Sequence, residues 1–426
     1  MQDGADPWVY QHTDGYYYFT KTTGGNVTIW KSKTLTGIDA APSRVIPTGC
    51  CNVWAPEIHY VNGAWYIYYA KDDGNNVNHR MYVLENTSAD PMQGTWTNKG
   101  QITDPTDRWA IDGTVLKVNN QLYFLWSGWE GSTNVRQNLY IARMSNPWTI
   151  SSARTEIARP VHSWETNHSP HVNEAPQVIV RGNVINLVYS ASGSWTNDYS
   201  LGLITAHTSS DLLQPSSWTK RSTPIFKSGN GLFGPGHHSF TKSPDGTEDW
   251  MLYHVAKFNN AGWNREIRAQ RFSWHADGTP SLGTPAAPNT PIAIPSGEPQ
   301  RVRYEGEQGT FGGVAYASPS QNGSGGSKAG HIDTASSYVE FSVYAAQAGE
   351  YVLAARTANG TAGGGWSSLT ITVNGVSSPF HVTHKGWENW GLSTLRTPLQ
   401  AGWNTVRFSR GTGYAELDFF DVYPAN

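Results

Sequence analysis

One short pattern recurs five times within the first 295 residues of the chain. Each copy joins a turn sequence such as Asp-Gly or Asn-Gly to a strand that is rich in Tyr, Trp and Phe. Asn, Asp and Gly tolerate the positive φ angles of a tight hairpin, so each copy predicts a β-hairpin. The copies follow one another at intervals of about 48 to 64 residues. They lie at residues 13–19, 61–69, 118–126, 181–189 and 244–253.

Further strand-like segments surround each hairpin. One precedes most of the turns, another follows the aromatic strand, and a Trp-Thr pair closes several copies, as at Trp96, Trp148 and Trp218. Four strands per copy and five copies predict a five-bladed β-propeller in an all-β chain. Other all-β repeats can give a similar rhythm, but the uneven spacing favours blades that are joined by loops of variable length.

Composition excludes several classes of protein. The 426 residues carry 30 Lys and Arg against 33 Asp and Glu, a net charge of −3, which argues against a nucleic-acid binder. No apolar run is long enough for a transmembrane helix, so we expect no membrane partner. The 19 Trp and 21 Tyr are numerous. They can fill a β core, or some can form flat platforms for the apolar faces of sugars.

Several features suggest an exported protein. Five Asn-X-Ser/Thr sequons are present, although Gly/Ser/Thr-rich chains also produce them by chance. The first residues show no signal-peptide pattern, and we expect that Met1 stands where such a segment was removed. The two cysteines, Cys50 and Cys51, are adjacent. Two interpretations stay open for them: reduced buried thiols, or a disulfide between neighbours.

The last third of the chain predicts a second domain. Residues 285–299 are rich in Pro and Ala, which favours an ordered connector. Residues 300–426 alternate apolar and polar positions in strands such as 338–343 and 369–373. This pattern predicts a β-sandwich of jelly-roll type. We therefore expect two domains, a propeller over residues 1–295 and a sandwich over residues 300–426.

Acidic residues recur where the innermost strand of a blade begins. Asp6, Asp112 and Glu174 each precede such a strand, and the matching places in blades two and five carry Trp54 and His237. Inner strands of a propeller converge on its axis, so these side chains should surround one central site. Paired carboxylates suit general acid–base work at a glycosidic bond. Acids beside Pro and Gly are often only turn formers, but three in register favour a function.

These motifs together resemble glycoside hydrolase family 43 over about residues 4–290. The segments that carry the likeness are 5–7, 54–57, 111–113, 173–176 and 234–237, followed by residues 265–274. The resemblance implies a five-bladed propeller and an enzyme that hydrolyses α-L-arabinofuranosides, β-xylosides or β-1,3-galactans with inversion. It requires no cofactor for the chemistry.

The resemblance also assigns roles to residues. It implies Asp6 as the general base, Glu174 as the general acid, and Asp112 as the acid that orients Glu174 and raises its pKa. His237 matches a histidine near the axis that can stand beside a metal ion, or it is a hydrogen-bonded core histidine. Arg265 matches an arginine that reaches the sugar or Glu174, with Arg268 as a rival. Trp54 is the candidate wall for stacking on the sugar, and an oxidised Cys50–Cys51 pair could add a hydrophobic rim.

The C-terminal domain resembles a carbohydrate-binding module of family 35 or the related family 6. The likeness rests on residues 304–307, 348–351, 356–360 and 417–423. It implies a structural Ca²⁺ held by Glu305, Glu307 and Asp418, and carboxylate oxygens suit that ion. Plain charge on an edge strand is the alternative. Trp387 resembles the loop aromatic that stacks on sugar, whereas Trp390 is expected in the core.

We therefore predict a secreted, inverting glycoside hydrolase that releases terminal α-L-arabinofuranosyl residues from arabinan or arabinose-substituted plant cell-wall polysaccharides. A β-xylosidase and an exo-β-1,3-galactosidase are alternatives within the same mechanism. A non-catalytic carbohydrate-binding protein is an alternative of another class. We expect a monomer with a polysaccharide or oligosaccharide substrate.

Overall fold

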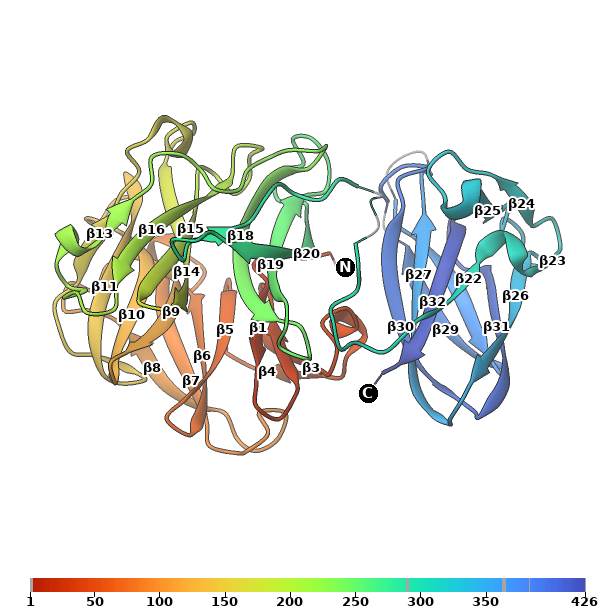
Figure 1. Cartoon of the computed structure of the whole chain (residues 1–426), viewed down its shortest axis with the longest axis horizontal. Coiled ribbons are helices and arrows are strands. Elements are labelled where there is room, and N and C mark those ends of the chain that lie inside the picture. Colours follow the sequence, from red (N-terminus) through yellow and green to blue (C-terminus); the bar gives the residue numbers. More distant parts are fainter. Residues whose placement is uncertain (1–2, 289, 291, 362–364, 383, 426) are drawn as a thin grey trace. The chain divides into compact units, whose positions relative to one another are not determined.

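The computed structural model is all-β and divides into two compact units (Figure 1). It describes residues 3–288, 290, 292–361, 365–382 and 384–425. The N-terminal unit consists of Asp3–Lys31 and Ser43–Ala287. The C-terminal unit contains Ser32–Pro42 and Pro288–Asn426. The first of these two segments follows the third strand of the chain. No pattern in the sequence indicated that it would belong to the C-terminal unit.

The strands of the N-terminal unit form five groups, numbered here along the chain, in which each strand pairs with the next, except that the last two strands of group 3 both pair with its third strand. Group 1 contains β1 (Trp8–Gln11), β2 (Tyr17–Thr20), β3 (Val27–Ser32) and β4 (Ser43–Ile46); group 2 contains β5 (Trp54–Val61), β6 (Ala64–Lys71), β7 (Arg80–Asn86) and β8 (Thr97–Ile102). Group 3 contains β9 (Ala110–Val118), β10 (Gln121–Trp129), β11 (Arg136–Asn146), β12 (Thr149–Ile150) and β13 (Thr155–Ala158). Group 4 contains β14 (His171–Arg181), β15 (Val184–Ala191), β16 (Ser200–His207) and β17 (Thr219–Lys220); group 5 contains β18 (Phe233–Lys242), β19 (Asp249–Ala256), β20 (Arg265–Trp274) and β21 (Pro280–Ser281).

Groups 3 and 4 are continuous. A short parallel pairing between β11 and β14 joins them into one nine-stranded sheet, whereas groups 1, 2 and 5 are separate four-stranded sheets. Short 3-10 helices lie in the connections of both units. They are η1 (Ile38–Ala40), η2 (Asn76–Asn78), η3 (Ser163–Glu165), η4 (Pro215–Ser217), η5 (Gly306–Gln308) and η6 (Ser324–Gly326). In the part of the chain that the structure describes, no helix has the length and apolar character needed to cross a membrane.

The five predicted hairpins are confirmed. Each aromatic repeat supplies the second strand of its group, namely β2, β6, β10, β15 and β19. The turn residues take the positive φ angles that the sequence predicts, for example 52° and 89° at Asn62 and Gly63 and 49° and 64° at Asn119 and Asn120. The aromatic side chains of these strands are largely core, because Trp65, Tyr68 and other large rings are fully buried.

The first strands of groups 2 to 5 share one irregularity near their beginning. In β5, the three-residue step from Trp54 to Glu57 faces only two residues of β6, from Ala70 to Tyr68. The same extra residue occurs once in β9 and in β14 and twice in β18. Such a β-bulge bends the strand and redirects its side chains.

A non-glycine residue with positive φ lies at this place in groups 2 to 5 and just before β1 in group 1. The residues are Asp6 (58°), Ala55 (42°), Asp112 (54°), Ala175 (47°) and His237 (43°). Left-handed backbone costs a residue with a Cβ roughly 1–2 kcal/mol, so five matching instances form a designed feature rather than scatter. Pro follows the strained residue in three groups, and it leaves no N–H unpaired in the bulge. We call these five residues the bulge residues.

The C-terminal unit has two sheets. One contains β22 (Val302–Glu305), β24 (Tyr316–Pro319), β25 (Ser327–Gly330), β27 (Gly349–Ala358), β30 (Gly391–Leu399) and β32 (Glu416–Pro424). The other contains β23 (Thr310–Gly312), β26 (Tyr338–Ala345), β28 (Ser367–Val373), β29 (Val376–Val382) and β31 (Gly402–Arg410). Both contribute to one apolar core, in which Phe341 and Phe408 of one sheet contact Phe420 of the other.

The segment Ser32–Pro42 is bonded to the start of the C-terminal unit. The Thr36 backbone N–H donates to Glu298 Oε1 at 3.0 Å, and Arg301 pairs with Glu298 Oε2 at 3.2 Å. Arg301 also lies over the ring of Tyr423. Asn289 and Pro291 of the predicted connector, and Met1, lie outside the described residues. The units separate at Ala287, a few residues before the expected end of the first domain.

The strain at a bulge residue can be tested against an ordinary alanine of the same sheet. Ala55 and Ala70 are both buried, but only Ala55 has positive φ. Both glycine variants lose one methyl group, whereas Ala55→Gly also relieves the left-handed strain. We expect Ala70→Gly to be less stable than Ala55→Gly by about 1 kcal/mol or more in urea unfolding. Equal losses would show that the bulge stores no strain.

Candidate active site

Three carboxylates from different strand groups lie buried near the start of the first strand of each group. Asp6 and Asp112 are themselves bulge residues, and Glu174 directly precedes the bulge residue Ala175. All three are less than 9% exposed. The Ala175 backbone N–H donates to Asp112 Oδ2 at 3.0 Å, which ties the segment that carries Glu174 to the neighbouring group. The structure therefore brings the three predicted acids to one site.

Asp6 is surrounded by nitrogen donors and a hydroxyl. Its Oδ1 lies 3.2 Å from His237 Nδ1 and 3.5 Å from an Arg265 guanidinium nitrogen, and the Thr22 hydroxyl donates to Oδ2 at 2.6 Å. Burial alone would raise the pKa of Asp6, but the charges of His237 and Arg265 and a hydrogen bond with His254 outweigh it. The pKa of Asp6 is therefore well below its usual range, and the group is ionised at neutral pH.

Glu174 has the opposite balance. Burial raises the pKa of Glu174 to about 7, and the negative charge of Asp6 adds to the increase. The Tyr199 hydroxyl donates to Glu174 Oε1 at 2.7 Å and moderates the rise, as does a hydrogen bond from Ser194. A Cβ at residue 236 would collide with the Tyr199 ring, so Gly236 lets that tyrosine reach the site. Two carboxyl groups with separated pKa values are suited to acid and base roles.

Asp112 is coupled to both of the other acids. Burial, followed by the charges of Glu174 and Asp6, raises its pKa well above the usual range. Its Oδ2 lies 4.0 Å from His237 Nδ1. Asp112 and Glu174 therefore form a buried pair in which each ionisation opposes the other.

The two arginines that the sequence left as rivals have different partners. Arg265 reaches Asp6, and its Nε is buried without a hydrogen-bond partner in the structure. Arg268 pairs with Glu266 at 2.6 Å. The alternation of side chains along a strand explains the separation, because residues three apart face opposite ways. Only Arg265 joins the acids.

Trp54 occupies the position before a bulge residue, as Glu174 does in group 4. It stacks on the buried ring of His79 at 4.0 Å between centroids. His79 Nδ1 lies 3.0 Å from Asp72 Oδ2. Trp54 is half-buried, so part of its ring remains exposed. The Ala55 backbone N–H donates to Thr22 Oγ1, which itself bonds to Asp6 and so links this wall to the acids.

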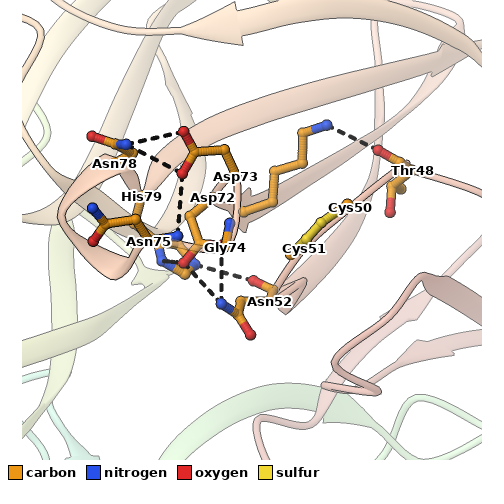
Figure 2. Close-up of a disulfide and its surroundings, with 11 residues drawn as sticks. Thr48, Cys50, Cys51, Asn52, Asp72, Asp73, Gly74, Asn75, Asn78 and His79 are labelled. Carbon is orange, nitrogen blue, oxygen red and sulfur yellow. Dashed lines mark hydrogen bonds and ion pairs between the residues drawn. A yellow bond between two sulfur atoms is a disulfide. The ribbon is translucent and has the colours of Figure 1, made fainter.

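The adjacent cysteines Cys50 and Cys51 are joined in a disulfide close to Asp72, the residue that contacts His79 (Figure 2). Cys51 and Asp72 exchange two backbone hydrogen bonds of 2.9 and 3.1 Å. Asn52 Nδ2 donates to both carboxylate oxygens of Asp72 at 2.9 Å. The disulfide therefore borders the residues that hold His79 under Trp54.

Several residues of the site were not predicted from the sequence. Thr22, Ser194, Tyr199 and His254 contact the carboxylates, but they lie on the later strands and loops of their groups. The Asp6 backbone N–H donates to His254 Nδ1 at 3.2 Å, and burial lowers the pKa of His254 to about 3. A repeat analysis that follows only inner-strand starts cannot find them. A search that also included the ends of β2, β6, β15 and β19 and the loops after them would have found these residues, because those segments lie beside the first strand of a group.

The predicted residues of the C-terminal unit fall in two places. Glu305, Glu307 and Asp418 gather around Ser324, which donates to Asp418 Oδ1 at 2.7 Å and to Glu305 Oε1 at 3.0 Å. Trp387 is 42% exposed and its ring covers Gly360, where a Cβ would collide with it. Trp390 is buried, as expected.

Comparison with known proteins identifies the family. Residues 1–280 match the profile of glycosyl hydrolases family 43. The extracellular exo-α-(1→5)-L-arabinofuranosidase of Streptomyces avermitilis is 42% identical over 310 residues, which are 68% of this chain and 64% of that relative. The crystal structure of an α-L-arabinofuranosidase from Lactobacillus brevis has 38% identity and a TM-score of 0.62, and covers 67% of this chain and 95% of that one. The chain therefore belongs to glycosyl hydrolases family 43.

A third comparison extends over both units. The exo-β-1,3-galactanase of Phanerochaete chrysosporium covers 99% of this chain and 96% of its own, with a TM-score of 0.56 and 17% identity. At that identity the likeness concerns the fold alone. The chain spans a little under two thirds of the Streptomyces relative, since 64% of that protein is matched.

Proposed function

We propose that this protein is an inverting, exo-acting α-L-arabinofuranosidase that removes terminal arabinofuranosyl residues from arabinan or arabinose-substituted plant polysaccharides. One observation carries the proposal: an ionised Asp6 and a protonated Glu174 share one buried site. The activities named for the relatives at 38% and 42% identity support arabinofuranose as the sugar. The same mechanism would serve a β-xylosidase or an exo-β-1,3-galactosidase, and those activities are outcomes of the test below.

In the proposed reaction, Asp6 accepts a proton from water as the water oxygen bonds to the anomeric carbon. Glu174 donates its proton to the glycosidic oxygen as the bond from that oxygen to the anomeric carbon breaks. Attack from the face opposite the leaving group inverts the anomeric centre. Proton exchange with solvent then restores an ionised Asp6 and a protonated Glu174. Asp112 accepts the Ala175 N–H and so positions the segment that carries Glu174. The two buried acids oppose each other's ionisation, and burial with the nearby charges raises the pKa of Asp112.

Two further residues are proposed to bind the terminal sugar, and a third holds the general base. The buried Nε–H of Arg265 lacks a protein partner and can donate to a sugar hydroxyl. Trp54 offers a half-exposed ring whose back is held by His79. His237 holds Asp6 in place, and burial keeps its pKa low. Among the described residues no three His, Cys, Asp or Glu side chains are arranged to hold a metal ion, so an ion beside His237 would need water molecules as further ligands.

We further propose that the five strand groups are the five blades of a β-propeller and that the C-terminal unit is a sandwich-type carbohydrate-binding module of family 35 or 6. A non-glycine residue with positive φ recurs once near the start of the first strand of each group, which supports a common axis for these strands. Two sheets around one core support the sandwich. We propose that the protein is secreted and monomeric, and the word extracellular in a relative's name supports export.

The C-terminal unit has features of a calcium site, although no three acidic side chains among the described residues stand in metal-binding geometry. Glu305 Oε2 and Glu307 Oε2 are buried without partners, which suits oxygen ligands of a cation. Asp418 already pairs with Arg356. We propose that the two glutamates hold a structural Ca²⁺ and that Asp418 completes its surroundings. The ion would stabilise the unit and take no part in hydrolysis.

The activity is tested with nitrophenyl α-L-arabinofuranoside, β-D-xyloside and β-D-galactoside. We expect turnover of the arabinofuranoside and a loss of about a thousandfold in kcat for Asp6→Ala and Glu174→Ala. Proton NMR should show β-arabinofuranose as the first product. Asp107→Asn, an exposed aspartate in the loop before β9, is the matched control. Preference for another glycoside would replace the substrate, and full activity in Asp6→Ala would refute the mechanism.

The C-terminal unit is tested by binding and by chelation. We expect the protein to co-sediment with insoluble arabinan, Trp387→Ala to lose this binding, and Trp403→Ala, which removes an exposed ring of β31, to retain it. Chelation with EGTA should lower the melting temperature of wild type but not that of a Glu305→Gln, Glu307→Gln double variant. An unchanged melting temperature with EGTA would exclude the calcium proposal, and binding by Trp387→Ala would exclude the stacking role.

A further inference from the structure

Two tryptophans face each other on neighbouring loops near the carboxylates. Trp195 lies in the loop between β15 and β16, and Trp263 lies in the loop between β19 and β20 (Figure 1). Their ring centroids are 5.6 Å apart and their planes are inclined by 40°. Trp263 is 64% exposed, whereas the aromatic rings of the strands are mostly buried. Trp195 is half-buried, so the Trp263 ring makes most of the exposed surface. An exposed aromatic surface beside an active site indicates a ligand contact.

The two loops are held together by a reciprocal amide pair. Asn197 Nδ2 donates to Asn260 Oδ1 at 2.9 Å, and the Asn260 backbone N–H donates to Asn197 Oδ1 at 3.0 Å. Asn197 Nδ2 also donates to Asn259 Oδ1 at 2.5 Å. These bonds fix the loops relative to one another, so the tryptophan pair is presented by a preformed surface.

Each tryptophan is close in sequence to a residue that contacts a catalytic carboxylate. Ser194, directly before Trp195, bonds to Glu174. Arg265, two residues after Trp263, contacts Asp6, and its guanidinium lies 5.1 Å from the Trp263 ring centroid. The surface therefore borders the acid and the base, at the end of groups 4 and 5 where the bulges lie.

The role of Glu174 indicates which part of the substrate meets this surface. The general acid must touch the glycosidic oxygen, so the sugar that departs with that oxygen lies on the Glu174 side of the bond. Trp195 is held beside Glu174 by the same loop. Trp54, in contrast, belongs to group 2 and has its own support in His79. The two aromatic surfaces thus serve different sugars.

We propose that Trp195 and Trp263 form the binding platform for the leaving-group sugar, the residue to which the terminal arabinofuranose is attached. This inference rests on the proposed arabinofuranosidase activity. The occupant is the penultimate arabinofuranosyl residue of an arabinan chain, whose C–H face packs on the indole rings. The platform makes the enzyme prefer oligosaccharides over substrates whose leaving group has no ring.

The test compares two substrates that share the terminal sugar. α-1,5-Arabinotriose places a sugar on the platform, whereas methyl α-L-arabinofuranoside leaves it empty. For Trp263→Ala and Trp195→Ala, we expect KM for the triose to rise about tenfold with little change in kcat. kcat/KM for the methyl glycoside should remain within about twofold of wild type. Phe258→Ala removes another exposed ring from the Trp263 loop and should change neither substrate.

Two results would overturn the platform. An unchanged KM for the triose in both variants would leave the rings without a role in binding, and an equal loss on both substrates would mean that they act only through Glu174 or Asp6. A direct binding measurement separates ground-state binding from chemistry: Glu174→Gln should bind the triose about tenfold more tightly than the same variant with Trp263→Ala. Failure of wild type to hydrolyse either arabinoside would instead refute the proposed function.

Discussion

The arrangement of the site depends on the left-handed backbone near the start of the first strand in each of the five groups. A regular strand would send alternate side chains to opposite faces of its own sheet, and the acids would then be packed between neighbouring groups. Positive φ turns Asp6, just before β1, and Asp112 and His237, in their bulges, toward a shared place, and it leaves Glu174 and Trp54 just before a bulge residue. In groups 2 and 4 the bulge residue itself is alanine, at Ala55 and Ala175, which is the smallest residue that has a Cβ. Asp tolerates this backbone better than most residues, so at Asp6 and Asp112 conformation and chemistry agree.

Burial gives the three carboxylates different properties because their partners differ. All are nearly inaccessible, which by itself disfavours their charged forms. Asp6 is compensated by Arg265, His237 and the hydroxyl of Thr22, and it remains ionised. Glu174 accepts hydrogen bonds from hydroxyl groups, but it is buried near the negative charge of Asp6, and its pKa rises to about 7. An acid and a base are thus produced from similar side chains by the charges placed next to each.

Much of this arrangement could be predicted from the sequence, for a physical reason. Hairpin turns such as Asn62-Gly63 need residues that accept positive φ, and this requirement is visible in the residue types. The same repeat then located the inner-strand starts, and with them Asp6, Asp112 and Glu174. Family membership was also predictable, because the motifs keep their order and spacing.

Other features could not be predicted because they depend on contacts between distant segments. Tyr199 reaches Glu174 only because residue 236, in the next group, is glycine. The segment Ser32–Pro42 belongs to the C-terminal unit through Thr36 and Glu298, which lie 262 positions apart. The amide pair that joins the Trp195 and Trp263 loops connects Asn197 with Asn260. No local pattern marks any of these contacts.

The central claim is that Glu174 is protonated and Asp6 ionised in the same site, and the pH dependence of kcat/KM for arabinobiose tests it most directly. The account predicts a plateau that ends near pH 7, where Glu174 loses its proton, and an acidic limb far lower because Asp6 stays ionised. Tyr199→Phe should move the basic limb to higher pH, since the lost hydroxyl stabilises the charged form of Glu174. A profile that rises through pH 7, or a basic limb that Tyr199→Phe shifts to lower pH, would contradict the account.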